Sequence, residues 1–185
     1  AGFGTDKPDT RFGLEIIDLS DECKGTEFKI FKDVLKKENG RVLSINAKGG
    51  ANFSRKELDG LNELAISFGG KGLSYFKVEN NKLNSPISKF FKENQLAAIS
   101  AKADAKEKDL LLIAAGEKPL IFEILGNIRL YLGDKMNLID QNRFNLLWII
   151  DFPLFKWNEE EKRLDSEHHP FTSPKFEDIE LLKTQ

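Results

Sequence analysis

The stretch DLLLIAAGEKPLIFEILGNIRLYLG, residues 109–133, is the most informative part of the sequence about the fold. It begins with a continuous apolar run from Asp109 to Ala115, which is typical of a strand that is central in a sheet or buried on both faces. Pro119 then favours the start of a helix, and Gly133 favours its end. Between them, apolar side chains recur at helical spacing and predict one buried face. That face comprises Leu120, Ile121, Ile124, Leu125, Ile128 and Leu132.

A second amphipathic helix is predicted in SRKELDGLNELAISFGG, residues 54–70. Ser54 and Glu57 have the spacing of a capping box, and Gly69 can adopt the left-handed conformation that ends a helix. One apolar face follows from Leu58, Leu61, Leu64, Ala65 and Phe68. We expect this face to pack into the core; a groove for a partner is the alternative.

Short runs around these helices predict the rest of the sheet. Alternating or β-rich patterns predict strands in EFKIF (27–31), RVLSINAK (41–48) and LSYFKV (73–78), with a turn at Asn39-Gly40. SPISKFF is expected to open a short helix with Ser85 as cap, and helical composition continues over 93–109. The order β-β-α-β-(α)-β-α favours an α+β, two-layer fold, with two long helices on one face of an antiparallel sheet.

The two ends of the chain differ from this compact middle. The first 25 residues are polar and turn-rich, with one short extended piece at 12–17. Near the other end, FNLLWIIDFPLF (144–155) predicts an apolar strand that ends at Asp151-Phe152-Pro153, and KWNEEEKRLDSE (156–167) has the composition of a solvated hairpin turn. We therefore predict a central domain at 26–140, flanked by segments 1–25 and 141–185 that belong to another body. The start without methionine and the uninterrupted helical pattern of ELLKTQ suggest a piece of a longer protein.

Composition excludes several classes of protein. The net charge of −2 and the pI of about 5.8 give no sign of a polybasic surface for nucleic-acid backbones. The single cysteine, Cys23, cannot form an internal disulfide and fits a reducing compartment, so the cytosol is the default. No apolar run approaches the roughly 18 residues that a membrane span needs. We expect a cytoplasmic protein with no membrane segment.

Few patterns suggest chemistry. GGKG at 69–72 follows a helix and precedes a strand, the reverse of a phosphate loop, so helix termination explains its glycines. The chain has two histidines, His168 and His169, which are adjacent, and no CxxC, HxH or HExxH pattern supplies further zinc ligands. Cys23 or a serine could meet a histidine in the fold, but no GxSxG elbow exists. Taken alone, the histidine pair is explained by an ordinary polar loop.

Four separated motifs change that interpretation. GTDKPDTRFGLE (4–15), INAKGGANFSRKELDGL (45–61), LNSPISKFF (83–91) and LWIIDFPLFKWNEEEKRLDSEHHPFTSP (147–174) together resemble bacterial-type aspartyl-tRNA synthetase. In that family an inserted GAD domain, with a β-β-α-β-β-α layer, lies between such motifs. The resemblance implies that the middle of the chain is this insert and that its flanks are strands of the class II catalytic sheet.

The same resemblance implies an aspartate–tRNA ligase, which uses ATP and Mg²⁺ to form aspartyl-adenylate and transfers aspartate to tRNA(Asp), in a homodimeric parent enzyme. It implies that His168 contacts the bound L-aspartate and that His169 supports it. The arginines of class II motifs 2 and 3 are missing, so no catalytic residue and no metal ligand is assigned and this chain is predicted to be inactive alone. For the insert we expect an accessory or scaffold role, with contact to the tRNA acceptor end as one option.

A different class of function stays open beside the ligase. A GAD-bearing subunit of a tRNA-dependent amidotransferase, or a free-standing tRNA-interaction module, would also contain the compact middle. The motifs DFPLF and HHPFTSP favour the ligase because an isolated module has no evident use for them.

Overall fold

The computed structural model describes residues 2–150, 155–158, 160–167 and 175–183. Its residues fall into two compact units, 1–145 and 146–185, which are described separately. The first unit contains β1 Ile16–Asp18, α1 Lys29–Val34, β2 Gly40–Ala47, η1 Gly50–Asn52, α2 Arg55–Ser67, β3 Ser74–Glu79, β4 Lys82–Asn84, η2 Ser88–Phe90, α3 Glu93–Lys102, β5 Leu110–Glu117 and α4 Leu120–Lys135. The second contains β6 Phe155–Asn158, β7 Arg163–Ser166 and η3 Phe176–Lys183.

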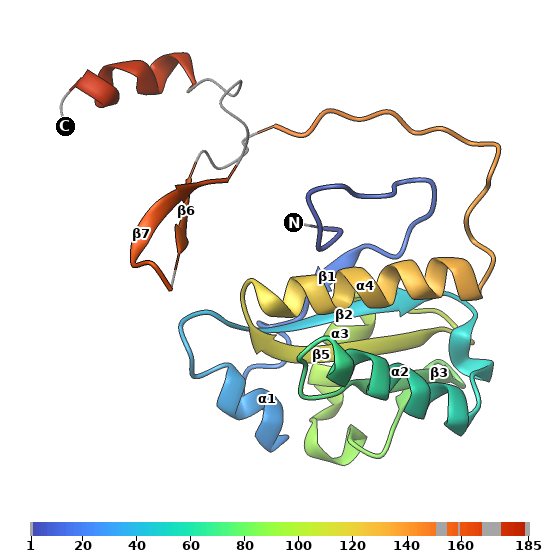
Figure 1. Ribbon diagram of the computed structural model, residues 1–185. Coiled ribbons are helices and arrows are strands. Elements are labelled where there is room, and N and C mark those ends of the chain that lie inside the picture. The colour runs from blue at the N-terminus through green and yellow to red at the C-terminus, as the bar shows by residue number, and fades with distance from the viewer. Residues whose placement is uncertain (1, 151–154, 159, 168–174, 184–185) are drawn as a thin grey trace. The chain divides into compact units, whose positions relative to one another are not determined.

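The first unit is built on a five-stranded antiparallel sheet in the order β1-β2-β5-β3-β4 (Figure 1). The strand β5 is central, as the apolar run at 109–115 predicts, and it pairs with β2 from Leu110↔Ala47 to Glu117↔Gly40. All but its last two residues are buried. The antiparallel α+β class predicted from the sequence is confirmed.

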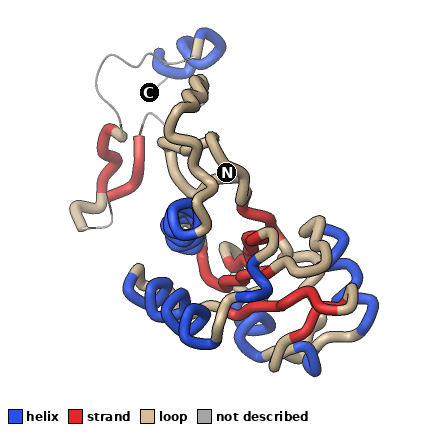
Figure 2. The backbone as a smooth tube through the Cα atoms, turned by 90° about the vertical axis from the view of Figure 1, so that its right-hand side faces the viewer, coloured by secondary structure: helices blue, strands red, loops and turns tan. Residues whose placement is uncertain are grey.

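The helices α2 and α4 share one face of the sheet, as predicted (Figures 1 and 2). The capping box of Ser54 and Glu57 is present, and Gly69 has a φ of 87° just after α2. The layer is closed by alternate residues of β2 and β5 against the apolar faces of both helices: Leu43, Ile45, Ala47, Leu58, Leu61, Ala65, Leu110, Leu112, Ala114, Ile121, Ile124, Leu125, Ile128 and Leu132.

The opposite face of the sheet is also covered, so the domain has a third layer that the two-layer prediction lacks. Helices α1 and α3 pack there with residues 19–23 and Phe91 around the other side chains of the same strands. The buried members of this layer include Leu19, Cys23, Phe31, Val34, Val42, Phe76, Val78, Leu83, Phe91, Ile99, Leu111 and Ile113. The central strands are therefore covered on both faces, which explains why β5 is apolar from Leu110 to Ala115.

Several local predictions are wrong. Residues 29–34 form the helix α1 rather than a strand, because Phe31 and Val34 point into the core while Ile30 is 47% exposed. Such a short apolar run fits both periodicities, and tertiary packing selects the helix. The neighbour of β2 on the side away from β5 is instead β1, which overlaps the end of the extended piece predicted for 12–17.

Two helix boundaries also differ. The helix α4 continues through Gly133 to Lys135, and Leu120 lies on its exposed side. The short helix expected from Ser85 begins only at Ser88, as the 3₁₀ turn η2; the Ser85 hydroxyl accepts a hydrogen bond from the Ile87 amide at 3.3 Å. Helix ends are set by local packing that periodicity does not report.

In the second unit, β6 and β7 form the hairpin that the composition of 156–167 predicts, with the register Phe155↔Ser166 to Asn158↔Arg163. The strand expected over 144–155 is only partly described, and residues 144–150 form no strand. Phe144, Leu146 and Trp148 are almost fully exposed. An apolar segment of this kind needs a neighbouring strand to bond with, and the described residues provide none.

Candidate functional site

The predicted substrate contacts, His168 and His169, lie outside the described residues. The described chain reaches them from β7 through Glu167, whose carboxylate forms an ion pair with Lys156 at 3.0 Å across the hairpin. The role of the histidines therefore stays a prediction. Among the residues that the structure does describe, we consider instead a site on α4, where a buried side chain makes several hydrogen bonds.

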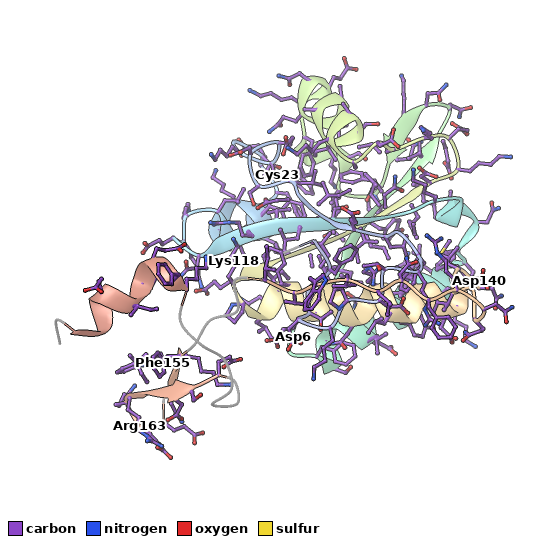
Figure 3. The ribbon with its side chains drawn as sticks, turned by 90° about the horizontal axis from the view of Figure 1, so that it is seen from above. Asp6, Cys23, Lys118, Asp140, Phe155 and Arg163 are labelled. Carbon is purple, nitrogen blue, oxygen red and sulfur yellow. The ribbon has the colours of Figure 1, made fainter. Side chains whose placement is uncertain are left out.

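Residues Gly126, Arg129 and Gly133 lie on one stripe of α4, at positions i, i+3 and i+7. The segment that carries the DKPDTRF motif packs against this stripe, and Figure 3 shows Asp6 beside the helix. A Cβ atom on Gly126 would lie 2.9 Å from the carbonyl oxygen of Gly4, and one on Gly133 would lie 2.7 Å from the ring of Phe12. Only glycine lets the backbone approach this closely.

Arg129 lies between these two glycines and is fully buried. Its Nη2 donates hydrogen bonds to the carbonyl oxygens of Asp9 (2.6 Å), Phe12 (2.9 Å) and Gly13 (2.8 Å), and its Nε donates to Gly13 at 3.1 Å. A guanidinium offers its donors in a planar fork. Arg129 therefore binds the turn at 9–13 through the backbone, whatever side chains that turn carries.

Two aromatic rings complete the surroundings of Arg129. The guanidinium carbon lies 4.1 Å from the ring centre of Phe12 and 4.8 Å from that of Phe3. Burial lowers the pKa of Arg129, while Asp9 and Glu15 act in the opposite direction. An arginine keeps its charge in proteins even so, and cation–π contact helps to offset its loss of water. The remaining donor, Nη1, is buried without a partner among the described residues.

The bound turn has its own internal order. The side chain of Arg11 forms a two-pronged pair with the carboxylate of Asp9, with Nε–Oδ1 at 3.0 Å and Nη2–Oδ2 at 2.7 Å. The hydrogen bond from Arg11 lowers the pKa of Asp9. On its far side, the turn accepts a hydrogen bond at the Thr10 carbonyl from the side-chain amide of Asn145, at 2.8 Å. The segment before the central domain and the segment after it thus meet at one turn.

We name this arrangement the Arg129 clamp: Arg129 and Asn145 with the turn 9–13. Arg129 and Asn145 donate hydrogen bonds to backbone carbonyls, and the Asp9 carboxylate is engaged by Arg11, so these groups offer neither a general base nor an activated nucleophile. In the part of the chain that is described, no group of three His, Cys, Asp or Glu side chains could hold a metal ion. The chemistry that the clamp can perform is positioning.

A groove of about 670 Å³ lies between β4 and α3, away from the clamp. Its lining includes the charged residues Lys82, Glu93, Asp104 and Lys106 and the apolar residues Leu96 and Ala97. The charges partly cancel, since Lys106 pairs with Asp104 at 3.4 Å. The groove combines no residues in an arrangement that suggests catalysis.

The sequence pattern did not predict a role for Arg129, because residues 119–133 read as an amphipathic helix that ends at Gly133. The available signal was the pattern GxxRxxxG on one helical stripe, with a basic residue next to an apolar face. From sequence alone, an arginine next to an apolar helix face is expected to be exposed to solvent. Its burial becomes evident only when the segment that covers it is known.

Comparison with known proteins shows which family the domain belongs to. The GAD domain family matches residues 31–125, about half of the chain, from within α1 to within α4. The chain belongs to the GAD domain family. Arg129 lies just beyond the matched range, so the clamp stands at the border between the GAD domain and its flanks.

Curated relatives cover the flanks as well. The chain is 49% identical over 181 residues, or 98% of its length, to the aspartate–tRNA(Asp/Asn) ligase of Aquifex aeolicus, and 46% identical to that of Hydrogenobaculum sp.. It is also 49% identical to the aspartate–tRNA ligase of Halalkalibacterium halodurans over 98% of the chain. The predicted resemblance to these ligases is confirmed. The chain spans about 30% of the length of these relatives.

Proposed function

We propose that this chain is the GAD-containing part of an aspartate–tRNA ligase. The parent enzyme activates L-aspartate with ATP to give aspartyl-adenylate and then transfers aspartate to tRNA(Asp). The observation that carries the proposal is the similarity of nearly the whole chain, flanks included, to proteins named as such ligases. A match confined to 31–125 would support a GAD domain in any setting.

Within that enzyme the GAD domain has an accessory role. Several of its titratable groups form exposed ion pairs on the surface, for example Arg55 with Asp59 at 3.0 Å and Lys48 with Asp104 at 3.2 Å. Such pairs are ordinary features of a solvated surface. From the similarity to these ligases we assign substrate contact to His168, with His169 as its support. The chemistry fits this role, since a histidine can donate a hydrogen bond to aspartate without the permanent charge of lysine.

The localisation, oligomeric state and partners of the parent enzyme are proposed on the same basis. We expect a cytoplasmic homodimer with tRNA(Asp), L-aspartate and ATP as its partners, and Mg²⁺ bound by residues that this chain does not supply. The single cysteine, Cys23, is buried, and burial raises its pKa to about 12, which makes the thiol unreactive at neutral pH. No helix in the described part of the chain is long and apolar enough to cross a membrane.

A chimaeric enzyme tests the proposal. The matched 181 residues of the Aquifex aeolicus ligase would be replaced by this chain, and charging of tRNA(Asp) would be measured against the parent and against a deletion of the same segment. We expect the chimaera to charge tRNA(Asp) and the deletion to be inactive. A well-folded but inactive chimaera would favour the alternative, an amidotransferase subunit or a free-standing tRNA-interaction module.

The isolated 185-residue chain should show no aspartate-dependent ATP–pyrophosphate exchange. Phosphoryl chemistry on ATP depends on positioned cations and metal ions, and no group of three His, Cys, Asp or Glu side chains among the described residues could hold a metal ion. Exchange by the purified chain above a no-enzyme control would contradict this part of the proposal.

A further inference from the structure

We propose that Arg129 is a positioning residue, which sets the place of both segments that connect the GAD domain to the rest of the enzyme. This inference rests on the proposed function for its activity readout and on the structure alone for its geometry. The observation behind it is that one buried side chain binds the turn at 9–13, which in turn accepts a hydrogen bond from Asn145.

The clamp is suited to this task because it holds backbone rather than side chains. Arg129 reaches three carbonyl oxygens within five residues of chain, and carbonyls at fixed positions in a tight turn define its orientation. The close approach of Gly4 to Gly126 fixes the same segment a second time, one helical turn away. The incoming segment therefore has two points of attachment along α4.

The outgoing segment is attached to the same turn. Asn145 lies where the first compact unit ends, and its amide donates to Thr10 rather than to the helix. Loss of the Arg129 hydrogen bonds should therefore loosen the incoming segment directly and the outgoing segment through Thr10. In the proposed ligase the outgoing segment leads to His168, so the clamp acts on aspartate binding at a distance.

The order of two substitutions separates positioning from simple packing. Arg129→Lys keeps a cation that can reach one or two carbonyls, whereas Arg129→Met keeps the apolar stem and loses every donor. If the hydrogen bonds matter, the ranking is wild type, then lysine, then methionine. If Arg129 only fills space between Phe3 and Phe12, methionine is tolerated better than a buried lysine charge.

The first measurement is hydrogen exchange of the complete 185-residue chain. We expect Arg129→Met to increase amide exchange of residues 3–16 by at least about 10-fold, with a smaller increase near 145 and little change in β2 and β5. Arg129→Lys should give an intermediate increase. Arg55→Met is the matched control, since Arg55 is an exposed helical arginine that pairs with Asp59. An equal increase throughout the sheet would overturn the positioning role.

The second measurement uses the chimaeric ligase described above. We expect the KM for aspartate to rise by roughly 10-fold or more in Arg129→Met, to rise less in Arg129→Lys and to stay unchanged in Arg55→Met. An inactive wild-type chimaera would count against the proposed function. The hydrogen-exchange measurement would then decide whether Arg129 is a positioning residue. An active chimaera in which methionine equals or surpasses lysine would overturn the inference.

Discussion

Arg129 donates two hydrogen bonds to the carbonyl oxygen of Gly13, 116 residues earlier in the chain, at 2.8 and 3.1 Å. This contact joins the last helix of the GAD domain to a segment that precedes it. Residues before 25 also enter the core, since Leu19 and Cys23 are fully buried. The domain boundaries at 25 and 140 stay a prediction, and the contacts indicate that the incoming segment and the domain fold as one body.

Gly126→Ala should weaken the attachment of the incoming segment. Alanine is ordinarily favoured over glycine inside a helix by about 1 kcal/mol, but here its Cβ would meet the Gly4 carbonyl oxygen at 2.9 Å. We expect the melting temperature to fall. Gly60→Ala is the matched control, because nothing lies within 4 Å of that Cβ on α2. It should raise the melting temperature, and a rise in both variants would refute the close contact.

Because of Glu57, the stability of the domain should decrease as the pH falls into the acid range. Its hydrogen bond with Lys135, together with the Ser54 cap, lowers its pKa from 4.5 to about 2. A carboxyl group whose pKa is lower in the folded state stabilises the fold above its unfolded pKa, and this contribution is lost as the pH falls toward the folded pKa.

We therefore expect the melting temperature to decrease between about pH 5 and about pH 2 more in wild type than in Glu57→Gln. Glutamine can still serve in the capping box, so the comparison reports mainly on the charge. Parallel pH profiles for the two proteins would show that the pairing with Lys135 contributes nothing measurable.

The side chain of Asp109, directly before β5, should be important for the stability of the domain. It is 4% exposed and accepts hydrogen bonds from the amides of Gly49 and Lys106, both at 2.9 Å, and from Asn46 at 3.1 Å. Each buried donor left unpaired costs about 1–3 kcal/mol, so Asp109→Ala should destabilise the domain by at least about 2 kcal/mol in urea unfolding. Asp104 has a φ of 44°, which asparagine tolerates as aspartate does, so Asp104→Asn removes the charge of exposed ion pairs only and should have little effect.

Limited proteolysis should divide the chain after residue 143. Exposed backbone without secondary structure is the preferred site of cleavage, and Phe144, Leu146 and Trp148 present exposed apolar side chains there. Chymotrypsin should leave a resistant product that begins near the start of the chain and ends close to Phe144. Early cleavage within the first 25 residues would contradict the packing of the incoming segment.

Structural features that depend on local patterns could be predicted from the sequence. The Ser54 capping box, the Gly69 stop, the central strand at 109–115 and the hairpin at 156–167 follow from spacing and composition, and the structure contains all four. The GAD family and the similarity to aspartate–tRNA ligases follow from motifs quoted in their order along the chain.

What depends on distant contacts could not be predicted in the same way. Whether residues 29–34 form a strand or a helix is decided by the core that Phe31 meets, and the third layer exists because α1 and α3 find an apolar sheet face. The burial of Arg129 likewise depends on a segment more than a hundred residues away. Periodicity along one element does not report which other element covers it.

Steady-state kinetics of His168→Ala in the chimaeric enzyme test most directly whether this chain carries the aspartate-contacting segment of a ligase. Loss of a hydrogen bond to a charged group costs about 1.5–3 kcal/mol, so kcat/KM for aspartate should fall roughly 10- to 100-fold. His169→Ala should have a smaller effect. Kinetics of His168→Ala that match the unsubstituted chimaera at subsaturating aspartate would contradict the claim.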